Sequence, residues 1–464
     1  MADGATTVTL AVVSHTNVGK TTLVRTLLRR DVGEVLDQAH VTTVSTAYPL
    51  LDADGARLVL EDTPGFGDSA RLLRRLGAEG NPIGWFLHQV WDRLRDRPLW
   101  CAQEAVRTVR ERADVVLYLV NASEAPGDAG YVAPEMQILS WAARPVVVVL
   151  NQTGPRPEPA LEQAWREAVR TVGVVRDVLP LDAFTRCWAQ ERTLLTKAVA
   201  LVPQGKRPAA QALLAAWDAR AAQTLRRSAA ALAADLVAAA ADREPLPVGA
   251  GKGEKAKAME ALAQRRTAAT RALVAALLEA HGLDGASAAV VEDRLEDFAV
   301  REAKSPDAKK GALWGGLVSG ALSGLAADLA AGGLTFGGGA VVGAILGALG
   351  GAGLAKGYAL AVRGTQPSVA WAPDALARLA RGAVARYVAV AHFGRGRGGW
   401  RDVELPADLA SHVAATSAAH ERGLHAALAA AAVADVERAV EAWLRDVLAR
   451  LCPDQAPWLL RPAG

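Results

Sequence analysis

The sequence predicts an α/β domain of mostly parallel strands with helices on both faces, followed by an all-α region that contains a glycine-rich helical hairpin. Three observations carry this prediction. Short apolar runs alternate with helical patterns up to about residue 190, alanine-rich helical patterns dominate afterwards, and glycines recur every four residues between 311 and 364. Runs such as V-V-L-Y-L-V and V-V-V-V-L are typical of strands buried on both faces of a parallel sheet.

Length and composition set broad limits on the class of protein. The 464 residues suffice for two or three domains, and 51% of them are hydrophobic. The net charge of +3 is too small to indicate a nucleic-acid partner. Cys101, Cys187 and Cys452 show neither disulfide nor zinc spacing, which fits a reducing compartment. The first residues lack a secretory signal, so a cytoplasmic location is expected.

The elements of the first domain follow from these patterns. Strands are expected at Thr7–Val13, Val44–Leu51, Arg57–Glu61, Asp114–Val120, Pro145–Leu150 and Val174–Pro180. Helices are expected between them, at Thr22–Arg30, Ala102–Arg112 and Ala133–Ala143. The long connection from Phe66 to Arg110 predicts a helical insertion with an aromatic core. Such β-α alternation predicts a doubly wound domain with its ligand at the carboxyl ends of the strands.

The loop after the first strand, Ser14–Thr21, reads S-H-T-N-V-G-K-T. A strand, a tight loop and a helix N-terminus together form a cradle of backbone N–H groups for phosphate. Lys20 is expected to reach the β- and γ-phosphates, and the Thr21 hydroxyl to hold Mg²⁺. Ser14 replaces the first glycine of the G-x-x-x-x-G-K-[ST] pattern, and serine adopts a positive φ less readily than glycine.

A second motif, Asp62-Thr63-Pro64-Gly65, follows the third expected strand. It matches the D-x-x-G that nucleotide-binding domains place there. Asp62 is expected to hold Mg²⁺ through its water shell, and the Gly65 N–H to contact the γ-phosphate. A plain turn is the alternative, because proline and glycine both favour turns. The position after a strand and after the lysine loop favours the nucleotide interpretation.

The glycine series lies in the C-terminal half. Gly316, Gly320 and Gly324 form one four-residue series, and a second runs from Gly339 to Gly351. Such small-xxx-small stripes let helices approach closely, as in many membrane helices. Lysines and arginines flank the pair, which suits a hairpin with both ends on the cytoplasmic side. The alternative is a close-packed helix pair in a soluble domain, because the first arm, 312–327, is short for a bilayer.

The remaining segments are expected to be helical, apart from a polar loop between the first two of them and an exposed loop at Phe393–Trp400. Helices are expected at Pro208–Asp242, Lys255–His281, Ala286–Arg301, Pro373–Ala389 and Pro406–Leu451. The organisation is therefore a nucleotide domain at 1–190, an alanine-rich helical domain at 191–303, the glycine-zipper hairpin at 304–364 and a C-terminal helical region at 365–464.

With these motifs assembled, residues 5–190 resemble bacterial GTPases of the Era and TrmE type. Asn17 matches the N-x-G-K-[ST] form of the loop in that group. Thr42 or Thr43 lies where the group carries its switch I threonine, and Thr43 is the preferred Mg²⁺ ligand. Asn151-Gln152-Thr153-Gly154 stands in place of N-K-x-D, and Asp182-Ala183-Phe184 in place of S-A-K. The rest resembles an uncharacterised domain, DUF3482, that is fused to such GTPases.

Two departures from the family pattern bear on activity. Gly154 occupies the position of the aspartate that would bind guanine N1 and N2, so ATP or relaxed base specificity stays open. Phe66 occupies the position of the water-orienting glutamine of Ras-like enzymes. Hydrolysis then needs another device: a monovalent cation, a partner or dimerisation. Asn17 matches the asparagine with which TrmE-like enzymes bind K⁺, and a loop-stabilising asparagine is the alternative.

The resemblance implies a GTP-binding switch that hydrolyses GTP slowly, with Mg²⁺ and K⁺ as ions, at the cytoplasmic face of the inner membrane through residues 311–363. A non-catalytic scaffold and a soluble Era-like RNA or ribosome factor are the alternatives; nucleic acid is not the expected partner, and a homodimer or a protein effector is. The expected catalytic residues are Lys20, Thr43 and Asn17, and the expected metal ligands are Thr21, Thr43 and Asp62. The expected nucleotide-binding residues are Ser14, His15, Thr16, Asn17, Val18, Gly19, Lys20, Thr21, Thr22, Asp62, Gly65, Asn151, Gln152 and Ala183.

Overall fold

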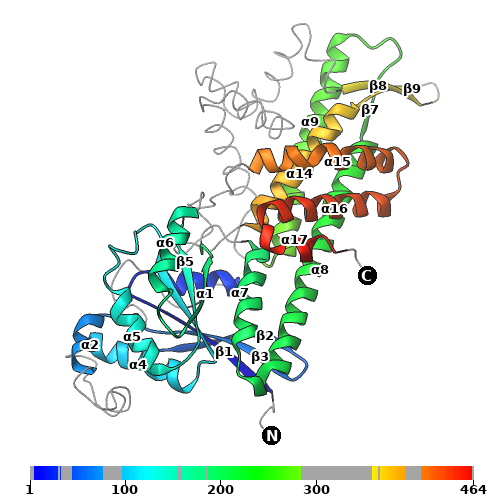
Figure 1. Ribbon diagram of the computed structural model, residues 1–464. Coiled ribbons are helices and arrows are strands. Elements are labelled where there is room, and N and C mark those ends of the chain that lie inside the picture. Colours follow the sequence, from blue (N-terminus) through cyan, green and yellow to red (C-terminus); the bar gives the residue numbers. More distant parts are fainter. Residues whose placement is uncertain are drawn as a thin grey trace. The chain divides into compact units, whose positions relative to one another are not determined.

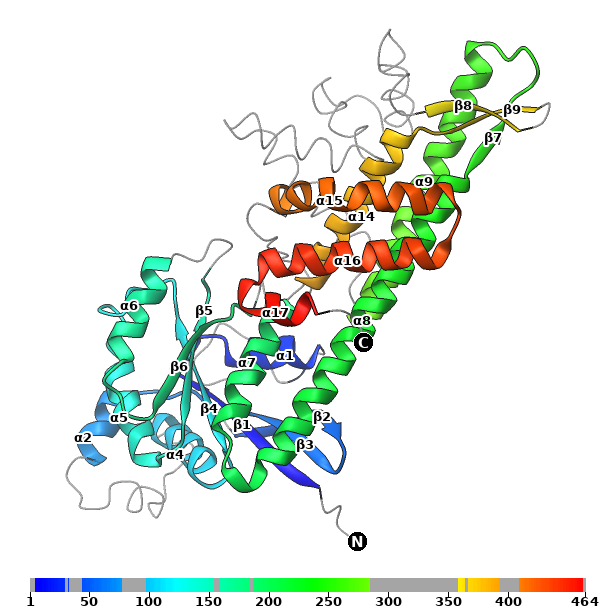
Figure 2. The ribbon, with the colours of Figure 1, turned by 45° about the vertical axis from the view of Figure 1, so that its right-hand side comes forward.

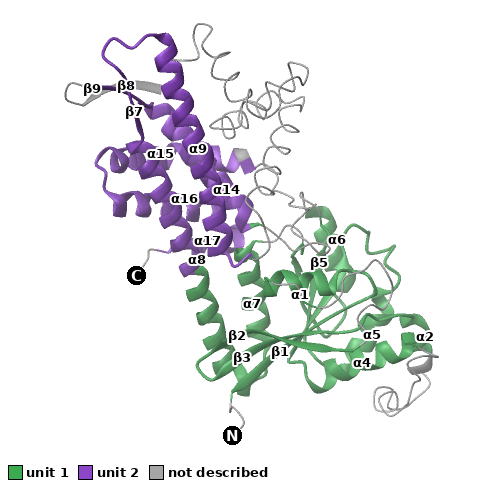
Figure 3. Ribbon diagram, turned by 180° about the vertical axis from the view of Figure 1, so that it is seen from behind, with its two compact units in different colours: residues 1–221, 392–404 green, residues 222–391, 405–464 purple. Residues whose placement is uncertain are grey.

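A computed structural model describes residues 5–29, 32, 44–76, 97–153, 159–183, 187–283, 358–363, 366–392 and 409–461. They divide into two compact units, drawn in separate colours in Figure 3: residues 1–221 with 392–404, and residues 222–391 with 405–464. The first unit thus extends past the boundary at residue 190 that the sequence suggested. The helix expected at Ala286–Arg301, both glycine series, and the loop from Phe393 to Trp400 lie outside the described residues.

The first unit is built around a six-stranded sheet, whose strands are labelled in Figure 2 and have the order β2-β3-β1-β4-β5-β6; Figure 1 shows the same unit from another side. Its strands are β1 (Thr6–Ser14), β2 (Thr46–Ala53), β3 (Ala56–Asp62), β4 (Val115–Asn121), β5 (Val146–Asn151) and β6 (Val175–Pro180). All neighbouring pairs are parallel except β2 and β3, which form an antiparallel hairpin. The predicted α/β fold and all six predicted strands are confirmed.

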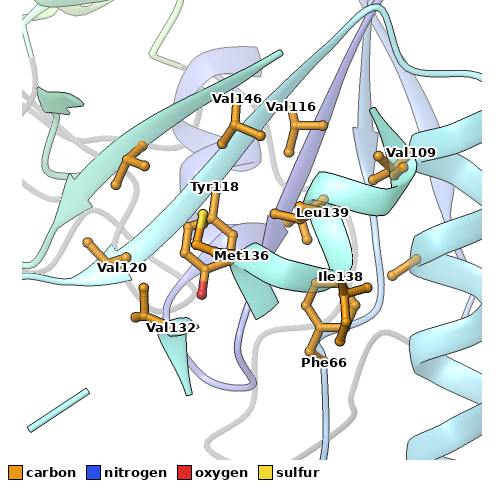
Figure 4. Packing of buried hydrophobic residues seen from close by; sticks show 14 of the residues in the cluster. Phe66, Val109, Val116, Tyr118, Val120, Val132, Met136, Ile138, Leu139 and Val146 are labelled. Atoms are coloured by element: carbon orange, nitrogen blue, oxygen red, sulfur yellow. The ribbon is translucent and has the colours of Figure 1, made fainter. Parts of the chain in front are cut away.

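Helices cover both faces of this sheet, as the doubly wound pattern predicts. On one face, α2 (Ser69–Leu76), α4 (Arg97–Glu111), α5 (Val132–Ala142) and α6 (Pro159–Val169) contribute to a core with β4 and β5. Figure 4 shows part of this core, with Phe66, Tyr118 and Met136 among its side chains. On the other face lie α1 (Lys20–Leu28), α7 (Trp188–Leu201) and the beginning of α8 (Arg207–Ala241).

The three sequence motifs all follow the carboxyl ends of strands in this sheet. β1 ends at Ser14, β3 at Asp62 and β5 at Asn151, and β1 and β3 are paired in parallel register, with Val12 opposite Asp62. Because parallel strands end at the same side of a sheet, the lysine loop, the D-T-P-G turn and the N-Q-T-G loop share that side. The parallel direction of these strands therefore fixes the place of the candidate site.

The second unit is mainly helical, as predicted. It contains the rest of α8, α9 (Lys252–Ala280), α14 (Pro373–Ala391), α15 (Leu409–Ala429), α16 (Val433–Leu451) and the short α17 (Ala456–Leu459). In Figure 2, α15 and α16 run side by side, and the Trp443 indole N–H donates to the Thr416 hydroxyl at 2.8 Å between them. The helical character expected over 406–451 is confirmed, as two helices, because the chain turns between α15 and α16 at Ala431, with φ 52°.

A small sheet in the second unit was not predicted. β7 (Arg243–Pro245), β8 (Tyr358–Arg363) and β9 (Gln366–Trp371) form an antiparallel sheet in the order β7-β9-β8. The end of the hairpin expected over 304–364 is therefore a strand and not a helix. Pairing between residues more than a hundred positions apart stabilises β7, and no local pattern of three residues can indicate such a contact.

Candidate nucleotide-binding site

The loop between β1 and α1 contains the conformations that a phosphate cradle needs. Gly19 has φ 100° and Asn17 has φ 64°, both in the left-handed region. A β-carbon at Gly19 would lie 2.7 Å from Asn151 Nδ2, so only glycine fits there. Asn17 is exposed, and asparagine tolerates its left-handed backbone better than most residues. The glycine of the motif and its asparagine thus have structural roles that the loop geometry requires.

Ser14 fits without the strain that a missing glycine suggests. It is the last residue of β1, it is fully buried, and it is not among the described residues with a positive φ. Its hydroxyl accepts a hydrogen bond from Lys20 Nζ at 3.1 Å, and the His15 carbonyl accepts a second at 3.3 Å. The ammonium group of Lys20 therefore lies against the loop, on the first residues of the motif.

Lys20 and Asp62 form the charged centre of the site. Both side chains are buried, and burial lowers the pKa of Lys20 against the opposing effects of Asp62 and Glu135. A β-carbon at Gly65 would lie 3.0 Å from Lys20 Nζ, so the D-T-P-G turn meets the lysine directly. The two motifs are thus brought together as the sequence predicts.

Asp62 has the arrangement of a metal ligand. The Thr21 hydroxyl donates to Asp62 Oδ2 at 2.8 Å, while Oδ1 is buried and has no hydrogen-bond partner among the described residues. Burial raises the pKa of Asp62 to about 6, and the Thr21 hydrogen bond opposes this rise. A buried carboxylate oxygen without a donor, next to a threonine hydroxyl, suits the oxygen-rich surroundings of Mg²⁺. These residues fit a divalent cation.

The shifted pKa of Asp62 gives a testable dependence of stability on pH. Since the pKa is raised from 3.8 to about 6, the folded state favours the protonated carboxyl. The stability that depends on this protonated carboxyl is fully present below pH ~4 and is lost as the pH rises through ~6. Asp62→Asn, neutral at every pH, should make the metal-free protein more stable than wild type by up to about 3 kcal/mol above pH 7, with no difference near pH 4. Urea denaturation in chelator at several pH values measures this.

The control for this prediction is Asp52→Asn, at an exposed aspartate that pairs with Arg57 on the outer hairpin. It removes a carboxylate from the same sheet without touching the buried site, so it should not become more stabilising as the pH rises. A gain for Asp62→Asn that is equal at pH 4 and pH 8 would contradict the assignment of the effect to the buried carboxylate.

Asn151 links the loop after β6 to the loop between β1 and α1. Its Nδ2 donates to the Val18 carbonyl at 2.8 Å, and its Oδ1 accepts from the Ala183 backbone N–H at 2.9 Å. The side chain is fully buried. It therefore holds the first loop and the loop after β6 together, where the resemblance places guanine recognition. Gln152 follows with φ 58°.

The other predicted residues divide into three groups. Thr16 donates through its hydroxyl to the Phe66 carbonyl at 3.0 Å, and Val18 and Thr22 are buried beside the loop. His15 does not face the lysine; its ring contacts Glu135. The switch residues Thr42 and Thr43, together with Gly154 and Phe184, lie outside the described residues.

Phe66 is a core residue. It is fully buried and packs with the helices α2, α4 and α5 (Figure 4). Its backbone N–H donates to the Ser14 carbonyl at 3.0 Å, and Phe66 forms an isolated parallel β-bridge with His15. The aromatic ring is thus an anchor for the D-T-P-G turn and does not contact solvent.

The site contains residues that sequence reasoning missed. Glu135 of α5 is fully buried next to the loop, and the Tyr118 hydroxyl donates to it at 2.7 Å. Burial raises the pKa of Glu135, while His15 and Tyr118 oppose this rise. The only sequence signal is an acidic residue within the apolar stretch of an amphipathic helix, which a solvent-facing position explains equally well.

Family models match both parts of the chain. A model described as "50S ribosome-binding GTPase" matches residues 9–152, and one described as "Domain of unknown function (DUF3482)" matches residues 175–446, more than half of the 464 residues. The chain belongs to the DUF3482 family. Its N-terminal unit is a GTPase domain, because the model match coincides with the lysine loop and the D-T-P-G turn on a six-stranded P-loop sheet.

Solved structures of Era are similar to this DUF3482 chain. One is Era in complex with MgGDPNP and nucleotides 1506–1542 of 16S ribosomal RNA, and another is a variant of Aquifex aeolicus Era bound to GDP.AlF4⁻. Each shows 19% sequence identity and a TM-score of 0.33, and the match covers 43% of this chain and 58% of the Era chain. The DUF3482 chain therefore spans little more than half of the Era structures. No curated protein matches it.

Proposed function

We propose that the DUF3482 chain binds GTP with Mg²⁺ and hydrolyses it slowly, as a nucleotide-dependent switch. The observation that carries this proposal is that the two motifs meet at the carboxyl ends of the strands in two close contacts, Thr21 with Asp62 and Lys20 with Gly65. Four groups from two motifs meet there in the arrangement that triphosphate binding requires.

Each group has a defined part in the proposed reaction. Lys20 would neutralise charge on the β- and γ-phosphates, the loop N–H groups would cradle them, and Gly65 would contact the γ-phosphate. Thr21, Asp62 and Thr43 would hold Mg²⁺, which supplies charge neutralisation when bound. Hydrolysis would be in-line attack of water on the γ-phosphate. These residues bind and orient, and none of them transfers a proton.

The binding partner is proposed to be a guanine nucleotide. Asn151 accepts a hydrogen bond from the Ala183 backbone N–H, and Ala183 lies in the loop that would contact the guanine base if the chain binds GTP as Era-type GTPases do. Titration calorimetry of the purified protein with GTP, GDP and ATP in Mg²⁺ tests this proposal. Heat from GTP and GDP without heat from ATP supports it, equal affinity for ATP makes the site a general purine site, and no heat from any of the three contradicts it.

The switch is proposed to run from the segment with Thr42 and Thr43 to the segment Asp62–Phe66. Ser45 lies two residues after Thr43, and the Thr108 hydroxyl of α4 donates to Ser45 Oγ at 2.7 Å. Arg112, one turn on, contacts both the Thr108 hydroxyl at 2.7 Å and Glu61, the neighbour of Asp62, at 3.3 Å. Displacement of one switch segment would therefore reach the other through α4.

Because Phe66 is buried, water must be oriented by another device, and Asn17 with K⁺ is our proposal. We expect turnover of GTP in K⁺ to exceed that in Na⁺ by about 10-fold or more, within the range that electrostatic groups contribute in such sites. Asn17→Ala should abolish the difference between the two salts. Phosphate release at equal ionic strength measures it, and equal rates in both salts for wild type would leave Asn17 with its backbone role alone.

A non-catalytic, nucleotide-gated scaffold is the second candidate, and the burial of Phe66 favours it. Turnover at saturating GTP separates the two, because a scaffold would bind GTP and show no phosphate release above that of Lys20→Ala.

We further propose that residues 311–363 associate with the membrane and that the helical unit contacts a protein effector or a second copy. No helix within the described ranges has the length and apolar character of a membrane span. Carbonate washing of membranes tests the association.

A further inference from the structure

Glu135 presents an unusual buried acid beside the phosphate loop. Its side chain has no solvent exposure, whereas the side chain of its partner His15 is 31% exposed. His15 Nδ1 and Glu135 Oε1 are 2.7 Å apart, so one proton lies between them, and the Tyr118 hydroxyl occupies the other carboxyl oxygen at 2.7 Å. Burying a carboxyl group costs free energy unless it is hydrogen-bonded, and here both oxygens are satisfied.

Two side chains hold the imidazole of this loop residue. Besides its contact with Glu135, the His15 ring stacks on Tyr131, with centroids 4.5 Å apart and planes at 20°. Tyr118, which bonds to Glu135, comes from β4, while Tyr131 directly precedes α5 and Glu135 lies in its first turn. The contacts therefore tie one side chain of the loop to the central strand and to the neighbouring helix.

The backbone of the same residue holds the D-T-P-G turn. His15 pairs with Phe66 in a parallel bridge, the Phe66 N–H donates to the Ser14 carbonyl at 3.0 Å, and the Thr16 hydroxyl donates to the Phe66 carbonyl at 3.0 Å. Gly65, whose N–H would contact the γ-phosphate, directly precedes this bridge. The position of the first half of the loop thus determines where the Gly65 amide points.

We propose that Glu135 and Tyr118 are positioning residues for γ-phosphate recognition, acting through His15 on the bridge that holds Gly65 and Phe66. This inference rests on the proposed GTP function and extends it to residues outside both motifs. GDP lacks the γ-phosphate that the Gly65 amide would contact. Loss of the Glu135 contact should therefore weaken a GTP analogue more than GDP.

The test is the ratio of the dissociation constants of a non-hydrolysable GTP analogue and GDP, measured with Mg²⁺ on the full chain. Glu135→Ala should weaken the analogue by about 10-fold and GDP by less than about 3-fold, as expected for one hydrogen bond to a charged group. Tyr118→Phe, which keeps the ring and removes one hydroxyl, should change the ratio in the same direction by about 3-fold. Glu135→Gln retains an acceptor for His15 and should recover part of the loss.

The matched control is Met136→Ala, at the next residue of α5, whose side chain packs in the hydrophobic core. It should lower thermal stability and leave the ratio unchanged. The double variant His15→Ala/Glu135→Ala should show the ratio of either single variant, because both remove the same contact. An unchanged ratio in Glu135→Ala and Tyr118→Phe, or effects of His15 and Glu135 that multiply independently, overturns the inference.

The outcome also separates this inference from the proposed function. If wild type binds both nucleotides, Lys20→Ala binds neither, and the ratio is the same in all Glu135 variants, the function stands and the positioning role falls. If wild type binds neither nucleotide, the function itself is wrong and the inference falls with it.

Discussion

Replacing Lys20 with alanine is expected to lower the affinity for GTP by about 10²–10³-fold, the scale on which single preorganised charged donors act in such sites. The ammonium group lies buried between the loop and the D-T-P-G turn, with the Ser14 hydroxyl and the His15 carbonyl as its acceptors. Both are weak partners compared with a triphosphate, so the group is free to exchange them on binding. Titration calorimetry with GTP and Mg²⁺ measures the loss.

The matched control is Lys197→Ala, at a lysine of α7 that pairs with Asp177 away from the loop. It removes the same charge from the same unit and should leave the affinity for GTP unchanged. Because Lys20 is buried at a cost, Lys20→Ala should not lower the melting temperature of the nucleotide-free protein. Equal GTP affinities in both variants would contradict the assignment of Lys20 to the nucleotide site. A large loss of stability in Lys20→Ala would contradict the view that Lys20 acts on bound phosphate and not on the fold.

Gly19→Ala is expected to disable the site through the backbone. An alanine at φ 100° costs about 1–2 kcal/mol, and its β-carbon would meet Asn151 Nδ2 at 2.7 Å. Asn151 must then release its hydrogen bonds to Val18 and Ala183, each worth about 1 kcal/mol. The free energy of unfolding should fall by about 3 kcal/mol in total. Urea denaturation measures this loss, and calorimetry should show GTP affinity reduced by more than about 10-fold.

Gly55→Ala separates backbone strain from the steric conflict. Gly55 also has a left-handed backbone, with φ 71°, in the β2–β3 hairpin, but a β-carbon there meets no atom within 4 Å. Its replacement should therefore cost only the conformational term of about 1–2 kcal/mol and leave nucleotide binding intact. If both variants lose the same stability and neither loses GTP affinity, the close approach of Asn151 to the loop does not matter for function.

The sequence predicts the fold of the first unit well because the strands in the middle of its sheet include nearly unbroken apolar runs. Val146–Asn151 and Val115–Asn121 are buried on both faces, and only a parallel sheet covered by helices offers such surroundings. The β7-β9-β8 sheet escapes prediction for the opposite reason. β7 has only three residues, and its partner β9 is distant in the chain, while β8 and β9 carry mixed residues and pair as a hairpin.

The site is predictable where a residue acts through the loop pattern and not where it acts through tertiary contacts. Lys20, Thr21 and Asp62 meet as their motifs imply. Glu135 and Tyr118 reach the loop only because α5 packs over β4, and neither stands in a motif. Ser14 does not strain the loop, because it is the last residue of β1 and has no positive φ.

The interior position of Phe66 has a consequence for how readily the protein could change shape. A turn whose next residue is a fully buried phenylalanine cannot swing outward without exposing that ring to water. Fully exposing such a side chain costs about 2–3 kcal/mol, which at 1.4 kcal/mol per tenfold leaves the open form at only a few per cent of molecules or less. Such a molecule would rest in its closed form by default, and whatever releases it must supply that free energy from outside the turn.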